Sequence, residues 1–248
     1  MKKELSLLCG WMRTSSNVVV FTGAGMSTES GLPDFRSANG MWKNVDPREL
    51  ASIRALNTNT REFYNFYKMR IEALEKAEPH DGHFILANWE NKNRVKHIIT
   101  QNVDGFHQKA GSKSVSELHG SLRISRCQDC GREYSAKKIL ERDFPRCEAC
   151  SGKLRPGVVL FGESLPLDAL EIADTESSNS ELFIVIGSSL EVSPANYFPV
   201  KAKNSGARLA IINLDDTNMD DYADVVIRGK TKEVLQELDH MISVRPSF

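Results

Sequence analysis

The sequence lacks a long hydrophobic run, and its 248 residues carry a formal net charge of only −1. No apolar stretch approaches the ~20 residues that a membrane-spanning helix requires. A nearly neutral chain also has no global basic field with which to attract nucleic acid or a membrane surface. Residues 1–5 include an acid and no apolar core, so they predict the start of an amphipathic helix instead of a signal peptide. We therefore expect a cytoplasmic protein with no membrane contact and no specific nucleic-acid partner.

Cysteine is scarce, with five residues, but four of them form two Cys-x-x-Cys pairs separated by sixteen residues. This spacing is typical of a two-knuckle zinc site and favours a metal over disulfides. Four thiolates complete a tetrahedral shell with no open position, so the sequence predicts one structural zinc. The predicted ligands are Cys127, Cys130, Cys147 and Cys150. The fifth, Cys9, is expected to be a core residue.

No sequence repeat is evident, and short β-branched apolar runs alternate with helical patterns. Such alternation favours an α/β fold with a mostly parallel sheet covered on both faces. Apolar periodicity predicts helices over residues 2–14 and 231–242, and a helical segment within 39–90 that Pro79 divides. Strands are predicted at 18–21, 96–100, 114–118, 155–163, 182–186, 208–215 and 225–227.

A glycine-rich loop follows the first predicted strand. Gly23 and Gly25 permit a tight turn and close approach of a ligand to the backbone, and Ser27 suits the N-cap of a short helix that attracts phosphate. This arrangement indicates a dinucleotide site, although a plain strand-to-helix turn would also use it. The third glycine is displaced to Gly31, and no acidic residue follows at about twenty positions, so an ordinary Rossmann dehydrogenase fits poorly.

The continuation of this loop offers more chemistry than a turn needs. Pro33 breaks the helix, which leaves Asp34, Phe35 and Arg36 on a loop beside the predicted phosphate site. Polar groups also follow the next strand, at Gln101, Asn102 and Asp104. Ligands bind at such strand ends in open α/β sheets.

One histidine stands out by its position. His119 ends a predicted strand just before Gly120 and Ser121, where an imidazole can act as a base near neutral pH. A lone histidine is more often structural, and we interpret the other five in that way: His80, His83, His97, His107 and His240.

The stretch from Gly23 to Arg36 resembles the cofactor loop of the sirtuins, which are NAD-dependent protein lysine deacylases. Further sirtuin-like motifs follow in chain order over essentially the whole sequence: Thr100-Gln101-Asn102-Val103-Asp104, Ala110-Gly111-Ser112, Leu118-His119-Gly120-Ser121, Val159-Leu160-Phe161-Gly162-Glu163, Gly187-Ser188-Ser189 and Asn213-Leu214-Asp215. Departures from the common pattern occur at Ser37, Gly157, Leu160 and Ser188, and none of them removes a reacting group. They leave the reaction class in place and open the question of substrate preference.

The resemblance implies a two-domain fold. A Rossmann-like NAD-binding domain would comprise residues 1–36, 91–122 and 156–248. A small domain would combine the helical module, 37–90, with the zinc module, 123–155. NAD and an acylated lysine of a protein substrate would meet in the cleft between the two domains.

The resemblance also assigns roles to residues. His119 would be the general base, with Asn102 and Asp104 holding the nicotinamide end and the reacting ribose, Gln101 contacting ribose, and Phe35 shielding the cationic intermediate. The remaining NAD contacts would be Gly23, Ala24, Gly25, Ser27, Asp34, Arg36, Gly187, Ser188, Ser189, Asn213, Leu214, Asp215 and Thr231. Val159, Phe161, Gly162 and Glu163 would contact the substrate. The products would be free lysine, nicotinamide and O-acyl-ADP-ribose.

A second pattern concerns which acyl group is removed. Sirtuins that remove succinyl and malonyl groups carry a Tyr-x-x-Arg pair in the region of Tyr67 and Arg70, and Ala51 matches their small pocket residue. Positions three apart share one helix face, and a guanidinium can hold a carboxylate bidentately. An alternative alignment puts Tyr64 at the motif's tyrosine and Tyr67 where the arginine belongs, which removes the pair.

Two other classes of function remain open. An NAD-dependent mono-ADP-ribosyltransferase would share the cofactor loop. A zinc-ribbon nucleic-acid binder would use residues 123–155, where nine Lys or Arg face five Asp or Glu, and its affinity would depend strongly on salt.

Overall fold

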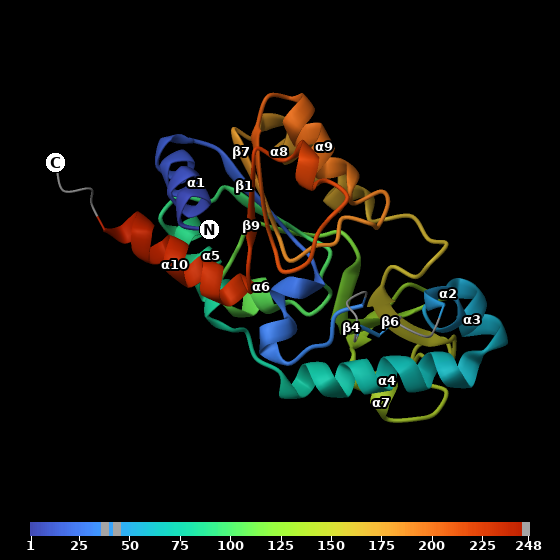
Figure 1. The fold of residues 1–248 in the computed structure, drawn as a ribbon. Coiled ribbons are helices and arrows are strands. Elements are labelled where there is room, and N and C mark those ends of the chain that lie inside the picture. The colour runs from blue at the N-terminus through green and yellow to red at the C-terminus, as the bar shows by residue number, and fades with distance from the viewer. Residues whose placement is uncertain (36–39, 42–45, 245–248) are drawn as a thin grey trace.

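The larger part of the molecule is built on a six-stranded parallel sheet (Figure 1). The computed structural model describes residues 1–35, 40–41 and 46–244. The strand order is β3-β2-β1-β7-β8-β9, and every neighbouring pair is parallel. The strands are β1 (Val18–Thr22), β2 (His97–Thr100), β3 (Val115–Glu117), β7 (Leu182–Ile186), β8 (Arg208–Asn213) and β9 (Val225–Arg228). The predicted Rossmann-like parallel sheet is confirmed.

Helices cover both faces of this sheet. Along β1, Val18 and Val20 pack on one face, and Val19 and Phe21 pack on the other, because side chains alternate along a strand. The first face is covered by α1 (Lys2–Thr14), α5 (Asp81–Asn91) and α10 (Thr231–Ser243), and the second by α8 (Leu167–Asn179) and α9 (Tyr197–Asn204). Burial on both sides explains why the strands read as continuous apolar runs.

A smaller antiparallel sheet lies beside the first one, in the order β5-β4-β6. It consists of β4 (Gly120–Cys127), β5 (Glu133–Ser135) and β6 (Leu154–Val158), and it shares a core with α2 (Pro47–Leu50), α3 (Ile53–Thr58), α4 (Thr60–Lys76) and α7 (Lys137–Leu140). The strand predicted over 155–163 is present as β6, which ends at Val158. It pairs antiparallel with β4 in the smaller sheet instead of joining the parallel sheet.

Helix α5 departs from the predicted helical module. Its Leu86 and Trp89 lie in the core beneath α1 and α10, and Trp89 Nε1 donates to Asp239 Oδ1 at 2.7 Å. A boundary near Pro79 therefore fits the packing better than one at residue 90. The division into two domains otherwise stays a prediction.

The remaining elements are short. They are α6 (Phe106–Lys109) and the 3₁₀ turns η1 (Ala24–Met26), η2 (Thr28–Ser30) and η3 (Asp220–Tyr222). Within the described ranges, no helix combines the length and the apolarity needed to cross a membrane.

Candidate active site and metal centre

Two adjoining cavities lie at the carboxyl ends of the parallel strands, with volumes of about 330 and 420 Å³. Ligand sites are expected at this edge of a parallel sheet. Ala24, Phe35, Gln101, Asn102 and His119 line both cavities. The two spaces therefore meet at the residues that the sequence singles out for chemistry.

The glycine-rich loop packs directly on the end of β7. A Cβ at Gly23 would lie 2.7 Å from the carbonyl oxygen of Gly187, and one at Gly25 would lie 2.9 Å from the Gly187 Cα. Gly25 N also donates to Gly187 O at 2.8 Å. These glycines are required first for backbone packing, which the sequence alone did not indicate.

Ser27 does not act as the predicted helix cap. The loop forms the two 3₁₀ turns η1 and η2, and the Ser27 side chain makes no capping bond to either. Its hydroxyl instead donates to Asp104 Oδ2 at 2.8 Å and accepts from Asn102 Nδ2 at 3.2 Å. Ser27 therefore links the cofactor loop to the polar residues that follow β2.

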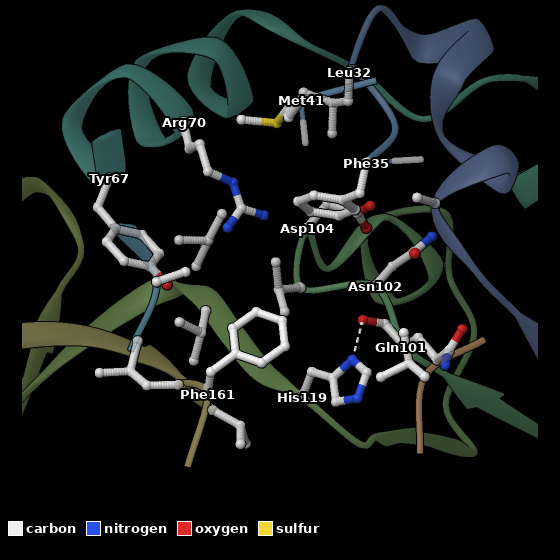
Figure 2. Close-up of a pocket in the computed structure, with 18 of the residues that line it drawn as sticks. Leu32, Phe35, Met41, Tyr67, Arg70, Gln101, Asn102, Asp104, His119 and Phe161 are labelled. Carbon is white, nitrogen blue, oxygen red and sulfur yellow. Dashed lines mark hydrogen bonds between the residues drawn. The ribbon is translucent and has the colours of Figure 1, made fainter. Parts of the chain in front are cut away.

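His119 is held in one orientation. Its Nδ1 lies 3.0 Å from the carbonyl oxygen of Gln101 (Figure 2). A carbonyl oxygen can only accept, so Nδ1 carries the hydrogen and the neutral ring keeps its lone pair on Nε2. The half-buried imidazole lines both cavities, which suits a base.

Asn102 and Asp104 are buried beside this base. Asn102 Nδ2 donates to Gly23 O at 3.0 Å, and Asp104 Oδ1 accepts from Phe106 N at 2.9 Å. Burial raises the pKa of Asp104, although the bonds from Phe106 and Ser27 oppose this shift. Asn102 lines both cavities, whereas Asp104 lines only the smaller one.

The larger cavity collects seven of the predicted NAD contacts: Gly187, Ser188, Ser189, Asn213, Leu214, Asp215 and Thr231. Asp34 also lines it, while Arg36 and Ser37 lie outside the described residues. Thr231 hydrogen-bonds Glu29 Oε2 at 3.2 Å, and the same oxygen accepts from Lys232 N at 2.8 Å. Glu29, absent from the predicted site, therefore ties the cofactor loop to the start of α10.

The smaller cavity collects the predicted substrate residues, namely Ala51, Tyr67, Arg70, Val159, Phe161, Gly162 and Glu163. Tyr64 is not among the residues lining it, and its hydroxyl donates to Leu154 O at 2.8 Å. Figure 2 shows the Arg70 guanidinium pointing into this cavity. Its central carbon lies 5.1 Å from the Phe35 ring centroid and 5.7 Å from that of Tyr67.

Glu163 lines the cavity, but its carboxylate bonds to the protein itself. It forms a bidentate pair with buried Arg155, at 2.6 and 2.8 Å, and accepts from Leu160 N at 2.8 Å. Burial opposes its ionisation, but these bonds and the Arg155 charge keep the pKa of Glu163 below its usual value. The Glu163 carboxylate holds the 159–163 segment in place, and a direct substrate contact stays a prediction.

The four predicted zinc ligands converge. The Sγ atoms of Cys127, Cys130, Cys147 and Cys150 all lie within 4.8 Å of one another. The Cys127–Cys150 and Cys130–Cys147 Sγ distances are 3.4 and 3.7 Å, close to the ~3.8 Å edge of a tetrahedron with Zn–S bonds of about 2.3 Å. The cluster therefore fits one structural zinc.

A cluster of three buried histidines lies behind the active site. The His83 ring lies edge-on to His80 and tilted to His107, with ring centroids 4.5 and 5.2 Å apart. His80 Nε2 contacts Met26 O at 2.6 Å, so the cluster supports the cofactor loop. Burial lowers the pKa of His83 to about 2 and that of His107 to about 4. Both fit the structural role predicted for them.

Acidification should therefore destabilise the fold. Unfolded histidines titrate near pH 6.5, whereas folded His107 and His83 stay neutral down to about pH 4 and about pH 2. The unfolded state then binds more protons than the folded state. The contribution of these two histidines to the free energy of unfolding is therefore fully present above about pH 6.5 and is lost as the pH falls below that value. Each proton contributes a slope of about 1.4 kcal/mol per pH unit.

Urea unfolding between about pH 5 and 7 measures this slope. His107→Gln should remove about one proton from this slope. A free energy of unfolding that does not change with pH over this range would contradict the expectation.

Comparisons of the chain with known proteins all indicate the same family. The family model described as "Sir2 family" matches residues 23–194. An NAD-dependent protein deacetylase of Oceanobacillus iheyensis is 53% identical over 232 residues, which cover 93% of this chain and 98% of that protein. NAD-dependent protein deacetylase 1 of Geobacillus kaustophilus is 51% identical over 238 residues, 95% of this chain and 98% of that protein.

Solved structures give the same result. A Sir2 structure with a p53 peptide and NAD⁺ superimposes with a TM-score of 0.87 and 38% identity, covering 95% of this chain and 97% of that one. A Sir2 histidine-to-alanine variant with a deacetylated p53 peptide and 3′-O-acetyl ADP ribose gives a TM-score of 0.91 at 38% identity, with the same coverage of both chains.

Proposed function

The chain belongs to the Sir2 family, and from that premise we propose that it is an NAD-dependent protein lysine deacylase whose basic activity is deacetylation. The observation that carries this proposal is the position of His119. Its imidazole faces both cavities, so one base can serve a dinucleotide in the larger cavity and an acyl-lysine in the smaller one. Relatives named as NAD-dependent protein deacetylases support this choice of reaction.

The residues present fit NAD as the co-substrate. The larger cavity offers backbone at Gly25 and Gly187 and polar side chains from Ser189 and Asn213, which suit phosphate and ribose oxygens. When bound, NAD supplies a ribose carbon that the acyl oxygen can attack as nicotinamide leaves. Asn102 and Asp104 would hold the nicotinamide end, and Phe35, which lines both cavities, would exclude water from the reacting centre.

The proton chemistry follows from the His119 tautomer. With Nδ1–H donated to Gln101 O, Nε2 is the atom that would accept a proton from a ribose hydroxyl. That hydroxyl, once deprotonated, would bond to the acyl carbon as the bond from this carbon to the lysine nitrogen breaks. One water would then supply the remaining oxygen, and the products would be free lysine, nicotinamide and O-acyl-ADP-ribose.

One experiment tests the reaction class. The protein is incubated with NAD and acetyl-, succinyl- or malonyl-lysine peptides, and the products are identified by mass spectrometry. We expect the free peptide together with nicotinamide and O-acyl-ADP-ribose, with acetyl-lysine consumed. Transfer of ADP-ribose to protein without loss of acyl groups would instead show a mono-ADP-ribosyltransferase. Salt-dependent binding of nucleic acid without any turnover would instead indicate that the zinc module is a nucleic-acid-binding module.

We propose a second activity, the removal of acidic acyl groups, on the basis of Arg70. Its guanidinium points into the cavity that Ala51 and Tyr67 also line (Figure 2). Among the described residues Arg70 forms no ion pair, and burial lowers its pKa although the Asp104 charge opposes this shift. A succinyl or malonyl carboxylate would supply a counter-charge in direct contact. Tyr64, the tyrosine of the alternative alignment, is not among the residues lining the cavity.

Arg70→Met should then depress desuccinylation far more than deacetylation. A lost hydrogen bond to a charged group costs about 1.5–3 kcal/mol, which corresponds to about a 10- to 100-fold drop in kcat/KM for the acidic substrate. Arg61→Met on the same helix is the matched control, because Arg61 lies over Phe144 and pairs with exposed Asp143. If the two activities fall together, or wild type leaves succinyl-lysine intact, the enzyme is a deacetylase without an acidic-acyl pocket.

A further inference from the structure

Ser188 and Gln101 meet above the end of the central strand. Gln101 follows β2 and Ser188 follows β7, and these two strands flank β1 in the sheet. The Ser188 hydroxyl donates to Gln101 Oε1 at 2.9 Å and accepts from Leu190 N at 3.3 Å. Ser188 is buried, so water does not compete for these bonds. A hydroxyl carries one hydrogen, and the hydrogen of Ser188 is directed at Gln101.

The other end of the Gln101 amide has no partner among the described residues. Its Nε2 is buried and makes no hydrogen bond within the described structure. Leaving such a donor unsatisfied costs about 1–3 kcal/mol, so it indicates a group that arrives with a ligand. Gln101 lines both cavities and accepts from His119 Nδ1 through its backbone oxygen. The missing partner is therefore a hydrogen-bond acceptor close to the base.

The reversed amide is disfavoured by the same contacts. With Nε2 turned toward Ser188, the hydroxyl would accept from both Nε2 and Leu190 N, and its own hydrogen would lose its acceptor. The amide orientation follows from this hydrogen-bond network. In the reversed state Oε1 would replace the donor, and an acceptor on the ligand would face a second acceptor.

We propose that Ser188 is a positioning residue that keeps Gln101 Nε2 available as a donor to a ribose hydroxyl oxygen of the bound NAD. A hydroxyl that accepts from Nε2–H has its own proton left to give, and His119 Nε2 is the nearby base in the proposed mechanism. Gln101 would thus act twice, through its backbone on the base and through its side chain on the group that loses the proton. This inference rests on the proposed function, because it requires NAD in the larger cavity.

Ser188→Ala should raise the KM for NAD and the Kd for ADP-ribose about 5- to 10-fold, since one neutral hydrogen bond is worth about 1–1.5 kcal/mol. The KM for the acetyl-lysine peptide should stay within about twofold. Ser188→Thr keeps the hydroxyl and should restore both constants. Ser180→Ala is the matched control, because Ser180 is also buried but lies before β7 and donates to Ser177 O. Calorimetry with ADP-ribose measures binding independently of turnover.

A double-mutant cycle separates positioning from a general structural effect. If Ser188 acts through Gln101, adding Ser188→Ala to Gln101→Ala should weaken ADP-ribose binding no further. An undiminished loss in the Gln101→Ala background, or a Ser188→Ala variant that binds like wild type, would overturn the inference while deacetylation by wild type still stands. Failure of the wild type to deacetylate with NAD would instead overturn the proposed function.

Discussion

His119→Ala is expected to reduce NAD-dependent deacetylation by ~10²–10⁴-fold, the usual cost of losing a general base. The side chain is half-buried, and its Nδ1 donates a hydrogen bond to Gln101 O. Its removal should therefore leave the sheet and the zinc module folded. Turnover with NAD and an acetyl-lysine peptide measures the loss. Zinc content and the thermal unfolding curve show whether the variant is folded.

His240→Ala provides the control, because this histidine lies on α10 and lines neither cavity. It should retain the activity of wild type. A His119→Ala protein that keeps nearly full turnover would remove this residue from the role of base.

Cys127→Ala is expected to abolish zinc binding and unfold the zinc module. Cys127 is buried at the end of β4, and its Sγ lies 3.4 Å from that of Cys150. Structural zinc contributes about 10–16 kcal/mol in small zinc peptides, which is as large as the whole stability of many domains. Three remaining thiolates cannot close the tetrahedron, so metal and fold should be lost together.

Elemental analysis and thermal unfolding of the same preparation test this expectation. Cys9→Ala is the matched control, because Cys9 is equally buried but lies on α1, outside the cluster. It should keep one zinc and lose only the small stability of a trimmed core side chain. Wild type purified without zinc, or full activity of metal-free protein, would reject a structural metal.

The parallel sheet and the zinc ligands could be predicted because each rests on local sequence pattern. Buried parallel strands such as Leu182–Ile186 are continuously apolar, and thiolates must come in closely spaced pairs to share one metal. The motif residues at the strand ends likewise fall around the two cavities, since the carboxyl ends of parallel strands share one edge.

The sequence could not predict which strands, helices and side chains contact each other when they lie apart in the chain. The apolar residues from Val158 to Phe161 look like those of β1, and only the pairing of β6 with β4 assigns this segment to the smaller sheet. The apolar residues of α5 do not indicate whether the helix packs on the parallel sheet or on the smaller sheet. The sequence predicts Glu163 as a substrate residue but does not indicate that Arg155, eight positions earlier, holds its carboxylate. The bond between Ser188 and Gln101 joins residues 87 positions apart, which no local pattern records.

Strand β4 joins the base to the metal. It begins directly after His119 and ends at Cys127, and Val159 N, just past β6, donates to His119 O at 2.8 Å. The chain from Gly120 to Val158 is therefore a loop whose two ends meet beside the imidazole. Closing such a loop costs conformational entropy that grows with the logarithm of its length. Zinc, by tying Cys127 to Cys150, leaves a shorter loop to close, so it lowers part of the cost of bringing the base and the acyl pocket together.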